Sequence, residues 1–289
     1  MTSPGSSGRC SAPSPRSSAV TRPLGFLTDY GQGTEHVGAL HAVAAAIAPH
    51  SARIDLAHDI PPGDIRWGAI LLERLVRLMP RDSVTVTVVD PGVGTDRRAV
   101  AVELEWGKVV VGPDNGLLGL AVDRQAVVRA VEVTSSQVMR APVSATFHGR
   151  DVFAPAAAHL ASGADLSDLG APVDIGTIVR AHLPDASALP GALEALVVGS
   201  DRFGNLGLWA GPEHLMAAGL VEGDRLWVAT AQGGRSQATL GRTFADVPRG
   251  ALLAYVDSHG LVSIALNGGD AGERVRAAAG EVVALMRQS

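Results

Sequence analysis

Four short segments of the chain place a carboxylate or an imidazole next to glycine or proline, directly after an apolar run. They are LTDYG from Leu27, VVDPGVGTDRR from Val88, VGPDNGLL from Val111 and TFHGRD from Thr146. Glycine lets a backbone approach a ligand closely, and proline fixes the path of a turn. Gathered at one place, such acidic, basic and imidazole groups could hold a small ligand and move a proton.

Each segment taken alone also has an ordinary structural interpretation. Asp-Gly and Asp-Pro pairs are common in turns, and segment 114–116, Asp-Asn-Gly, is the most turn-like. Arg97 and Arg98 could form a solvated pair, and His148 could be a hydrogen-bonded core histidine. No role is assigned to the histidines expected on helix-like or loop surfaces, which are His36, His41, His50 and His58.

The elements that must position these segments alternate between strand and helix. Apolar and β-branched runs predict strands, and Ala-rich or amphipathic stretches predict helices. The expected strands lie in 23–28, 52–60, 83–90, 99–106 and 108–114, and the expected helices in 35–49, 64–79 and 152–163. This order favours an α/β domain with a largely parallel or mixed sheet, which binds ligands at the carboxyl ends of its strands.

A different pattern begins near residue 190, where short strands alternate with glycine-rich turns. These strands are expected in 192–201, 225–231, 237–244, 251–258 and 261–267, a pattern typical of a small β-barrel or sandwich. The first 22 residues are rich in Ser, Pro and Gly and predict a disordered tail. We therefore expect a tail at 1–22, an α/β domain at 23–188 and a smaller, all-β, barrel-like domain at 189–289.

Composition narrows the class of protein. Of 289 residues, 46% are hydrophobic and 18% charged, which is enough apolar surface for a core. The net charge of -5 gives no basic surface for nucleic acid or an anionic membrane. Cys10 is the single cysteine, so a disulfide framework and a thiolate metal site are excluded. No apolar run approaches the roughly 18 residues of a membrane span, and we expect a soluble, cytoplasmic protein.

The sequence lacks the motifs of several common enzyme and nucleotide-binding classes. The sequence has no P-loop, no GxGxxG after a strand, no GxSxG and no HExxH. A two-metal phosphatase would need several histidine ligands, and only His148 lies in a suitable motif. We therefore expect no metal site.

Taken together, the motifs carry a family resemblance. From about Leu24 to its C-terminus the chain resembles the S-adenosylmethionine hydroxide adenosyltransferases (SAM hydrolases), relatives of the fluorinase and chlorinase enzymes. The motifs are FLTDYG, HDIPPGDIRWGA, VVDPGVGTDRRAV, GPDNGLL, TFHGRDVFAPAAAHLA, DRFGNL and YVDSHGLVSIALNGGDA. Two positions depart from the family pattern: Tyr30 stands where Phe is commoner, and LGLWAG after Asn205 lacks the usual Thr-Asn.

The resemblance implies a fold, a reaction and a set of site residues. It implies an N-terminal α/β domain, a C-terminal β-barrel and a homotrimer whose substrate lies between neighbouring subunits. It also implies attack of water-derived hydroxide on ribose C5′ of S-adenosylmethionine, giving adenosine and L-methionine without metal or cofactor. The implied catalytic residues are Asp90, Arg97 and His148. The implied substrate-binding residues are Asp29, at the ribose hydroxyls, and Asp201, Phe203, Asn205 and Ser258.

Two alternative functions remain beside hydrolysis. The first is a non-catalytic S-adenosylmethionine or adenosine-binding protein. The second is a 5′-halogenase, but halide-using members replace the Asp of VVDPG with a Tyr-type residue, and their counterpart of FHG reads as an aromatic residue followed by Ser. This chain has Asp90, His148 and Gly149, which favours water as the nucleophile. Whether Asp90 or His148 is the base stays open at this level.

Overall fold

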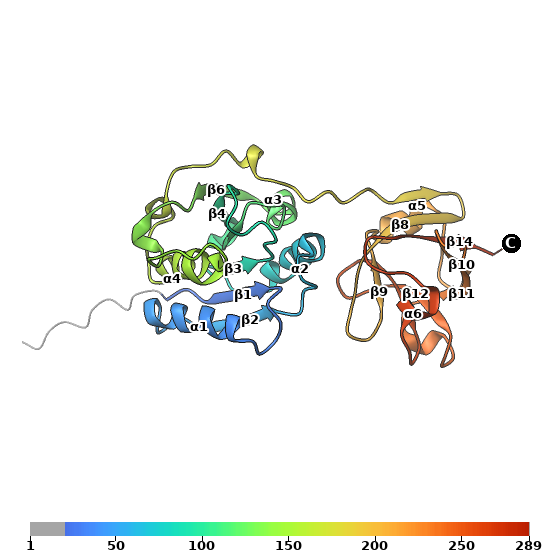
Figure 1. Ribbon diagram of the computed structural model, residues 1–289. Helices are drawn as coiled ribbons and strands as arrows, with labels where there is room; N and C mark the ends of the chain where they lie inside the picture. Colours follow the sequence, from blue (N-terminus) through green and yellow to red (C-terminus); the bar gives the residue numbers. More distant parts are fainter. Residues whose placement is uncertain (1–20, 289) are drawn as a thin grey trace, which may run out of the picture.

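The computed structural model describes residues 21–288 and shows an α/β domain followed by a β-barrel (Figure 1). The predicted tail at 1–22 falls almost entirely outside the described residues. No helix in the described part combines the length and apolar character needed to cross a bilayer.

The first domain is built on a mixed six-stranded sheet in the order β2-β1-β3-β5-β4-β6. Strands β2, β1, β3 and β5 are parallel, whereas β4 is antiparallel to both neighbours. The strands are β1 Leu24–Thr28, β2 Arg53–Ala57, β3 Val84–Val88, β4 Ala99–Leu104, β5 Val109–Pro113 and β6 Val127–Glu132. Only a short turn joins β4 to β5, and such a connection permits an antiparallel pair alone. Strand β6 has no counterpart among the sequence predictions.

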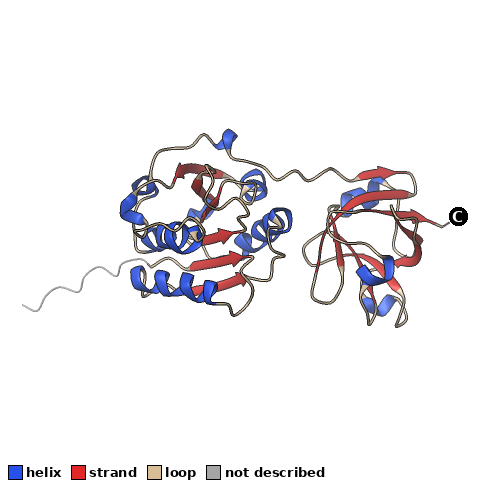
Figure 2. Cartoon of the chain, in the orientation of Figure 1, coloured by secondary structure: helices blue, strands red, loops and turns tan. Residues whose placement is uncertain are grey.

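Helices cover both faces of this sheet (Figure 2). Helices α1 and α4 pack together in one apolar core with β1 and β3, while α2 and α3 contribute to a second core on the other face. Buried on both sides, β3 consists entirely of buried Val and Thr, as a central parallel strand requires. The helices are α1 Glu35–Ile47, α2 Ile65–Leu78, α3 Gly119–Arg124 and α4 Ala154–Ala161.

The second domain is a closed barrel rather than a sandwich. Seven strands, β8 to β14, form a continuous ring that the antiparallel pairing of β14 with β8 closes, and β7 extends one edge. Closure leaves no free edge around the ring, which protects a small sheet from edge-to-edge association. The strands are β7 Ser187–Leu189, β8 Ala192–Ser200, β9 Leu206–Leu208, β10 Arg225–Thr230, β11 Arg235–Leu240, β12 Leu252–Val256, β13 Val262–Leu266 and β14 Val282–Arg287.

Two short helices accompany the barrel, α5 Pro212–Ala217 and α6 Ala271–Val275. The yellow segment in Figure 1 leads from the α/β domain to β7. Ile70 of α2 packs with Leu196 and Val198 of β8 in a small apolar cluster, so the two domains contact each other there. The domain boundary at residue 188 stays a prediction.

Candidate active site

The loops that follow β1 and β3 open into one cavity. These strands are parallel neighbours, with Thr28 opposite Val88, so the residues after them emerge side by side at the same edge. The cavity measures about 400 Å³, and its lining includes Asp29, Asp90 and His148. Residues from three of the four sequence motifs are thus brought together by the sheet.

Asp90, Arg97 and His148 form a connected polar group at this cavity. Arg97 Nε donates to both carboxylate oxygens of Asp90, at 2.8 and 3.0 Å, and Arg97 Nη2 also donates to Asp90. The same Nη2 atom donates to Nδ1 of His148 at 2.8 Å. The side chains of Asp90 and Arg97 are 4% and 9% exposed. Because it is buried, this bidentate ion pair is only weakly screened by solvent.

The surroundings of His148 keep its imidazole neutral. Partial burial lowers the pKa of His148, the adjacent Arg97 cation lowers it further, and the Asp90 carboxylate opposes them in part. Because a guanidinium only donates, Nδ1 of His148 must be the accepting nitrogen, and the ring proton lies on Nε2.

Asp29 is held by the loop that precedes α2. Its Oδ2 atom accepts a hydrogen bond from the backbone N–H of Gly63 at 2.8 Å. Burial raises the pKa of Asp29, an effect that the Gly63 bond partly offsets. Gly63 has φ of +75°, a left-handed conformation that side chains disfavour. Asp64 then caps the N-terminus of α2 by accepting a hydrogen bond from the backbone N–H of Trp67 at 3.0 Å. The segment PPGD, residues 61–64, therefore orients both α2 and the Asp29 carboxylate.

Tyr30 is a cavity residue to which the sequence analysis gave no role. Its ring packs edge-on against Phe147 with ring centres 5.8 Å apart. A Cβ atom placed on Gly149 would clash with the Tyr30 hydroxyl, so the phenol fills the space that a side chain at 149 would need. Burial, with the nearby Asp29 and Asp90 carboxylates, raises the pKa of Tyr30, and the phenol keeps its proton.

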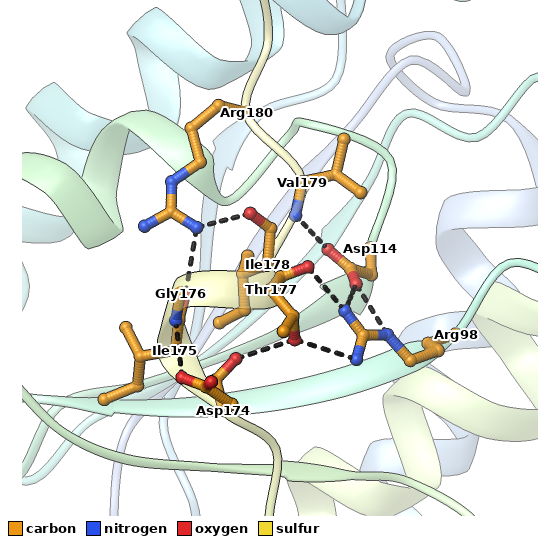
Figure 3. A network of polar contacts seen from close by, with 9 residues as sticks. All are labelled: Arg98, Asp114, Asp174, Ile175, Gly176, Thr177, Ile178, Val179 and Arg180. Atoms are coloured by element: carbon orange, nitrogen blue, oxygen red, sulfur yellow. Dashed lines mark hydrogen bonds and ion pairs between the residues drawn. The ribbon is translucent and has the colours of Figure 1, made fainter.

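The GPDNG segment, residues 112–116, holds in place the backbone that leads to Asp90. Asn115 Nδ2 donates to the carbonyl of Val89 at 2.9 Å, which fixes the backbone just before Asp90. Asp114 accepts from Arg98 Nε and from the N–H of Val179, both at 2.8 Å. Figure 3 shows Arg98 also reaching Thr177, so that Asp114 and Arg98 hold the segment 174–180. These contacts favour the structural interpretation of Asp114.

The last two residues of the FHGRD motif, Arg150 and Asp151, form hydrogen bonds that hold the motif in place. Arg150 forms two hydrogen bonds with Asp151, at 2.7 and 2.8 Å, and Asp151 also accepts from the N–H of Ser144 at 2.9 Å. Asp151 is only 1% exposed. Its bonds therefore orient the backbone that carries His148.

The predicted residues of the C-terminal domain lie at a different cavity. Asp201, Phe203 and Asn205 line a space of about 700 Å³ together with Phe244. Asp201 accepts from the N–H groups of Phe203 and Asn205, at 2.8 and 3.0 Å, and from the Asn205 side chain at 2.8 Å. Phe203 is 67% exposed, and the Arg202 guanidinium lies over its ring, with Cζ 5.2 Å from the ring centre. Ser258 sits in the exposed turn after β12 and does not line this cavity.

The structure corrects one sequence expectation and adds one cavity residue that the sequence did not single out. His58, expected on a surface, is in fact 1% exposed, because the chain after β2 turns back under the β1 loop. Phe244 lies in none of the sequence motifs, and it lines the same cavity as Phe203 only because the fold brings the two residues together. Substrate and catalytic roles for the predicted residues stay predictions.

Comparison with known proteins gives a consistent assignment. Residues 24–170 match the N-terminal domain model of the SAM hydroxide adenosyltransferases, and residues 195–284 match the C-terminal domain model. An (R)-S-adenosyl-L-methionine hydrolase of Salinispora arenicola is 44% identical over 91% of this chain and 97% of its own length. A fluorinase of Actinopolyspora mzabensis is 28% identical over 87% and 93%.

A solved structure agrees with the fold. An uncharacterized conserved protein from Thermotoga maritima superposes with a TM-score of 0.85 at 30% identity, covering 91% of this chain and all of that one. Both domain models match in chain order, and the motifs of the first line the cavity described above. The chain belongs to the SAM hydroxide adenosyltransferase family.

Proposed function

We propose that the protein hydrolyses S-adenosyl-L-methionine to adenosine and L-methionine. The observation that carries this proposal is the Asp90–Arg97–His148 group on a cavity that Asp29 also lines. Family membership and the 44% identity to a named hydrolase support it.

The reaction replaces one bond at ribose C5′ by another. A water oxygen bonds to C5′ as the C5′–S bond breaks, and the bonding pair stays on sulfur, which becomes the neutral thioether of methionine. Water, with a pKa of about 15.7, must give up a proton to an acceptor during this step. We assign that acceptor to Asp90, because a carboxylate keeps free lone pairs beside its bonds from Arg97, whereas Arg97 occupies Nδ1, the single accepting nitrogen of His148. His148 then presents Nε2–H, which can hold the attacking oxygen in place.

The charge change explains the apolar part of the cavity wall. Hydroxide and sulfonium neutralise each other as the new bond forms, so a poorly solvated site favours the transition state over separated ions. Val88 and Val93, together with Pro62 and Pro91, supply that surface. Alignment of water behind C5′, with Asp29 holding the ribose hydroxyls, would contribute about 7 kcal/mol or more to lowering the barrier.

The same proposal includes a homotrimer without a resident cofactor, located in the cytoplasm. Asp201, Phe203, Asn205 and Ser258 of one copy would complete the site on the α/β domain of another. Supporting this, Asp29 and Phe203 line separate cavities within one chain. Co-expression of Asp90→Ala chains with Phe203→Ala chains tests it: shared sites restore part of the activity, whereas sites within single chains leave the mixture as inactive as each variant.

One assay separates hydrolysis from its two alternatives. The purified protein is incubated with S-adenosylmethionine in ¹⁸O-water, with and without chloride. Labelled adenosine and methionine support hydrolysis, binding without turnover indicates a binding protein, and 5′-chloroadenosine indicates a halogenase. A serine at Gly149 would have to displace the Tyr30 phenol, which favours the first outcome.

A further inference from the structure

Three potential metal ligands meet beside the β1–β2 edge of the sheet, outside the active-site cavity. They come from α1, from β2 and from the residue that follows β2: His41, Asp55 and His58. Nε2 of His41 lies 2.7 Å from Oδ1 of Asp55, and Nε2 of His58 lies 3.0 Å from the same oxygen. The three ligand atoms all lie within 4.8 Å of one another, so one ion could contact all three after small side-chain rotations.

The buried member of this group points to a ligand. The His58 side chain is fully buried, and its Nε2 atom has no hydrogen-bond partner of acceptable geometry among the described residues. Oδ1 of Asp55 lies 3.0 Å from this nitrogen and is shared with His41. A buried ring nitrogen is normally satisfied, and coordination to a metal ion would satisfy this one.

Neighbouring groups already orient both imidazoles. Nδ1 of His58 lies 2.8 Å from the hydroxyl of Thr28, which leaves Nε2 as the nitrogen facing Asp55. A hydrogen bond to the second ring nitrogen is the usual support of a metal-binding histidine. The His41 ring stacks on Phe26 with ring centres 4.6 Å apart and a 30° tilt. Both rings are therefore fixed before any ion binds.

We propose that His41, Asp55 and His58 bind a divalent first-row transition metal ion of the zinc type. Two imidazole nitrogens and one carboxylate oxygen suit Zn²⁺, Co²⁺ or Ni²⁺ better than Mg²⁺ or Ca²⁺, which prefer oxygen ligands alone. The side chains of His41 and Asp55 are 27% and 42% exposed. An ion can enter from that side and complete its coordination with solvent.

The expected role of this ion is structural. Besides the contact of His58 Nδ1 with Thr28, the backbone carbonyl of His58 accepts from the N–H of Gly31 at 2.8 Å. Both contacts hold the loop that carries Asp29. Metal binding at His58 would therefore stabilise the β1 loop against local opening, without taking part in the reaction.

The test uses the full-length chain free of any polyhistidine tag, in a Cys10→Ser background that removes the single thiol. After treatment with a chelator, the protein is titrated with ZnCl₂ by calorimetry and its melting temperature is followed. CoCl₂ is added separately to record the visible bands that cobalt shows with nitrogen ligands. One ion per chain, a rise in melting temperature and cobalt bands are expected.

Matched variants locate the binding. His41→Ala and Asp55→Asn should lose the zinc-dependent rise, whereas His50→Ala, an exposed histidine past the end of α1, should keep it. Thr28→Val should weaken binding about tenfold or more through the lost support of His58. Circular dichroism of the metal-free variants checks that each is folded. Absence of zinc binding by the parent chain, or equal binding by folded His41→Ala, would overturn the proposal.

Discussion

Arg97 joins Asp90 to His148 by donating from a single nitrogen, Nη2, to both side chains. The guanidinium is a permanent cation with no acceptor, so it binds the Asp90 carboxylate through its N–H groups and fixes the tautomer of His148. The position of the proton on His148 Nε2 is therefore a consequence of Arg97.

The pH dependence of activity follows from the lowered pKa of His148. Burial and the Arg97 cation disfavour the imidazolium, so the neutral ring persists to a pH below its ordinary pKa of about 6.5. We expect kcat/KM to stay level from neutral pH to 6.5 and to fall only at lower pH, as Nδ1 takes a proton and loses its bond to Arg97. If the measured kcat/KM fell on the acid side with a midpoint above pH 6.5, the lowered pKa of His148 would be contradicted.

Replacing Asp90 should affect the chemical step. Asp90→Ala removes the proposed proton acceptor and the partner of Arg97, and we expect turnover to fall by at least about a hundredfold. The measurement is kcat for adenosine release. Asp96→Ala, an exposed carboxylate in the same loop, is the matched control and should retain parental turnover. Unchanged kcat in Asp90→Ala would refute the assignment.

Asp29 should act mainly on substrate binding. Asp29→Ala removes the carboxylate that we assign to the ribose hydroxyls, so KM should rise more than kcat falls. Asp29→Asn keeps the shape and an oxygen for the Gly63 N–H, and should raise KM less. If the alanine variant kept the parental KM, Asp29 would not be a ribose ligand.

The packing of Tyr30 against Gly149 predicts a pair of compensating substitutions. Gly149→Ala forces its methyl group into the Tyr30 phenol, and overpacking of this kind costs about 1–3 kcal/mol. Its melting temperature and activity should fall, and Tyr30→Leu in the same chain should recover stability. Gly38→Ala, on α1 with open space around it, should be neutral or stabilising. A Gly149→Ala chain as stable as the parent would show that the phenol can move aside.

The Arg98–Asp114 pair should matter for stability more than a surface pair does. The Asp114 side chain is 2% exposed, so Arg98→Ala leaves a buried carboxylate without its cation, at a cost of about 3 kcal/mol in the free energy of unfolding. Arg129→Ala breaks exposed pairs with Glu103 and Asp165 and should cost about 1 kcal/mol or less. Urea denaturation of the two variants compares them, and equal losses would contradict the difference in burial.

The sequence by itself determined the α/β domain, the following all-β domain and the short segments that carry the polar residues. Apolar runs and glycine-rich turns are local signals, and β1, β3 and α2 formed where those signals are strong. The three-residue β9 is too short to carry a pattern of its own, and its pairing partners stabilise it as a strand. Strand β6, by contrast, contains three valines and does carry a local strand signal.

Only the tertiary structure decided which side chains meet. Arg97 and His148 are 51 positions apart, and His58 reaches Thr28 across 30; no spacing rule links such residues, because the sheet order brings them together. Closure of the barrel likewise depends on β14 pairing with β8. Burial, which neutralises His148 and isolates Nε2 of His58, is a property of the packed molecule, since it arises from atoms contributed by distant segments.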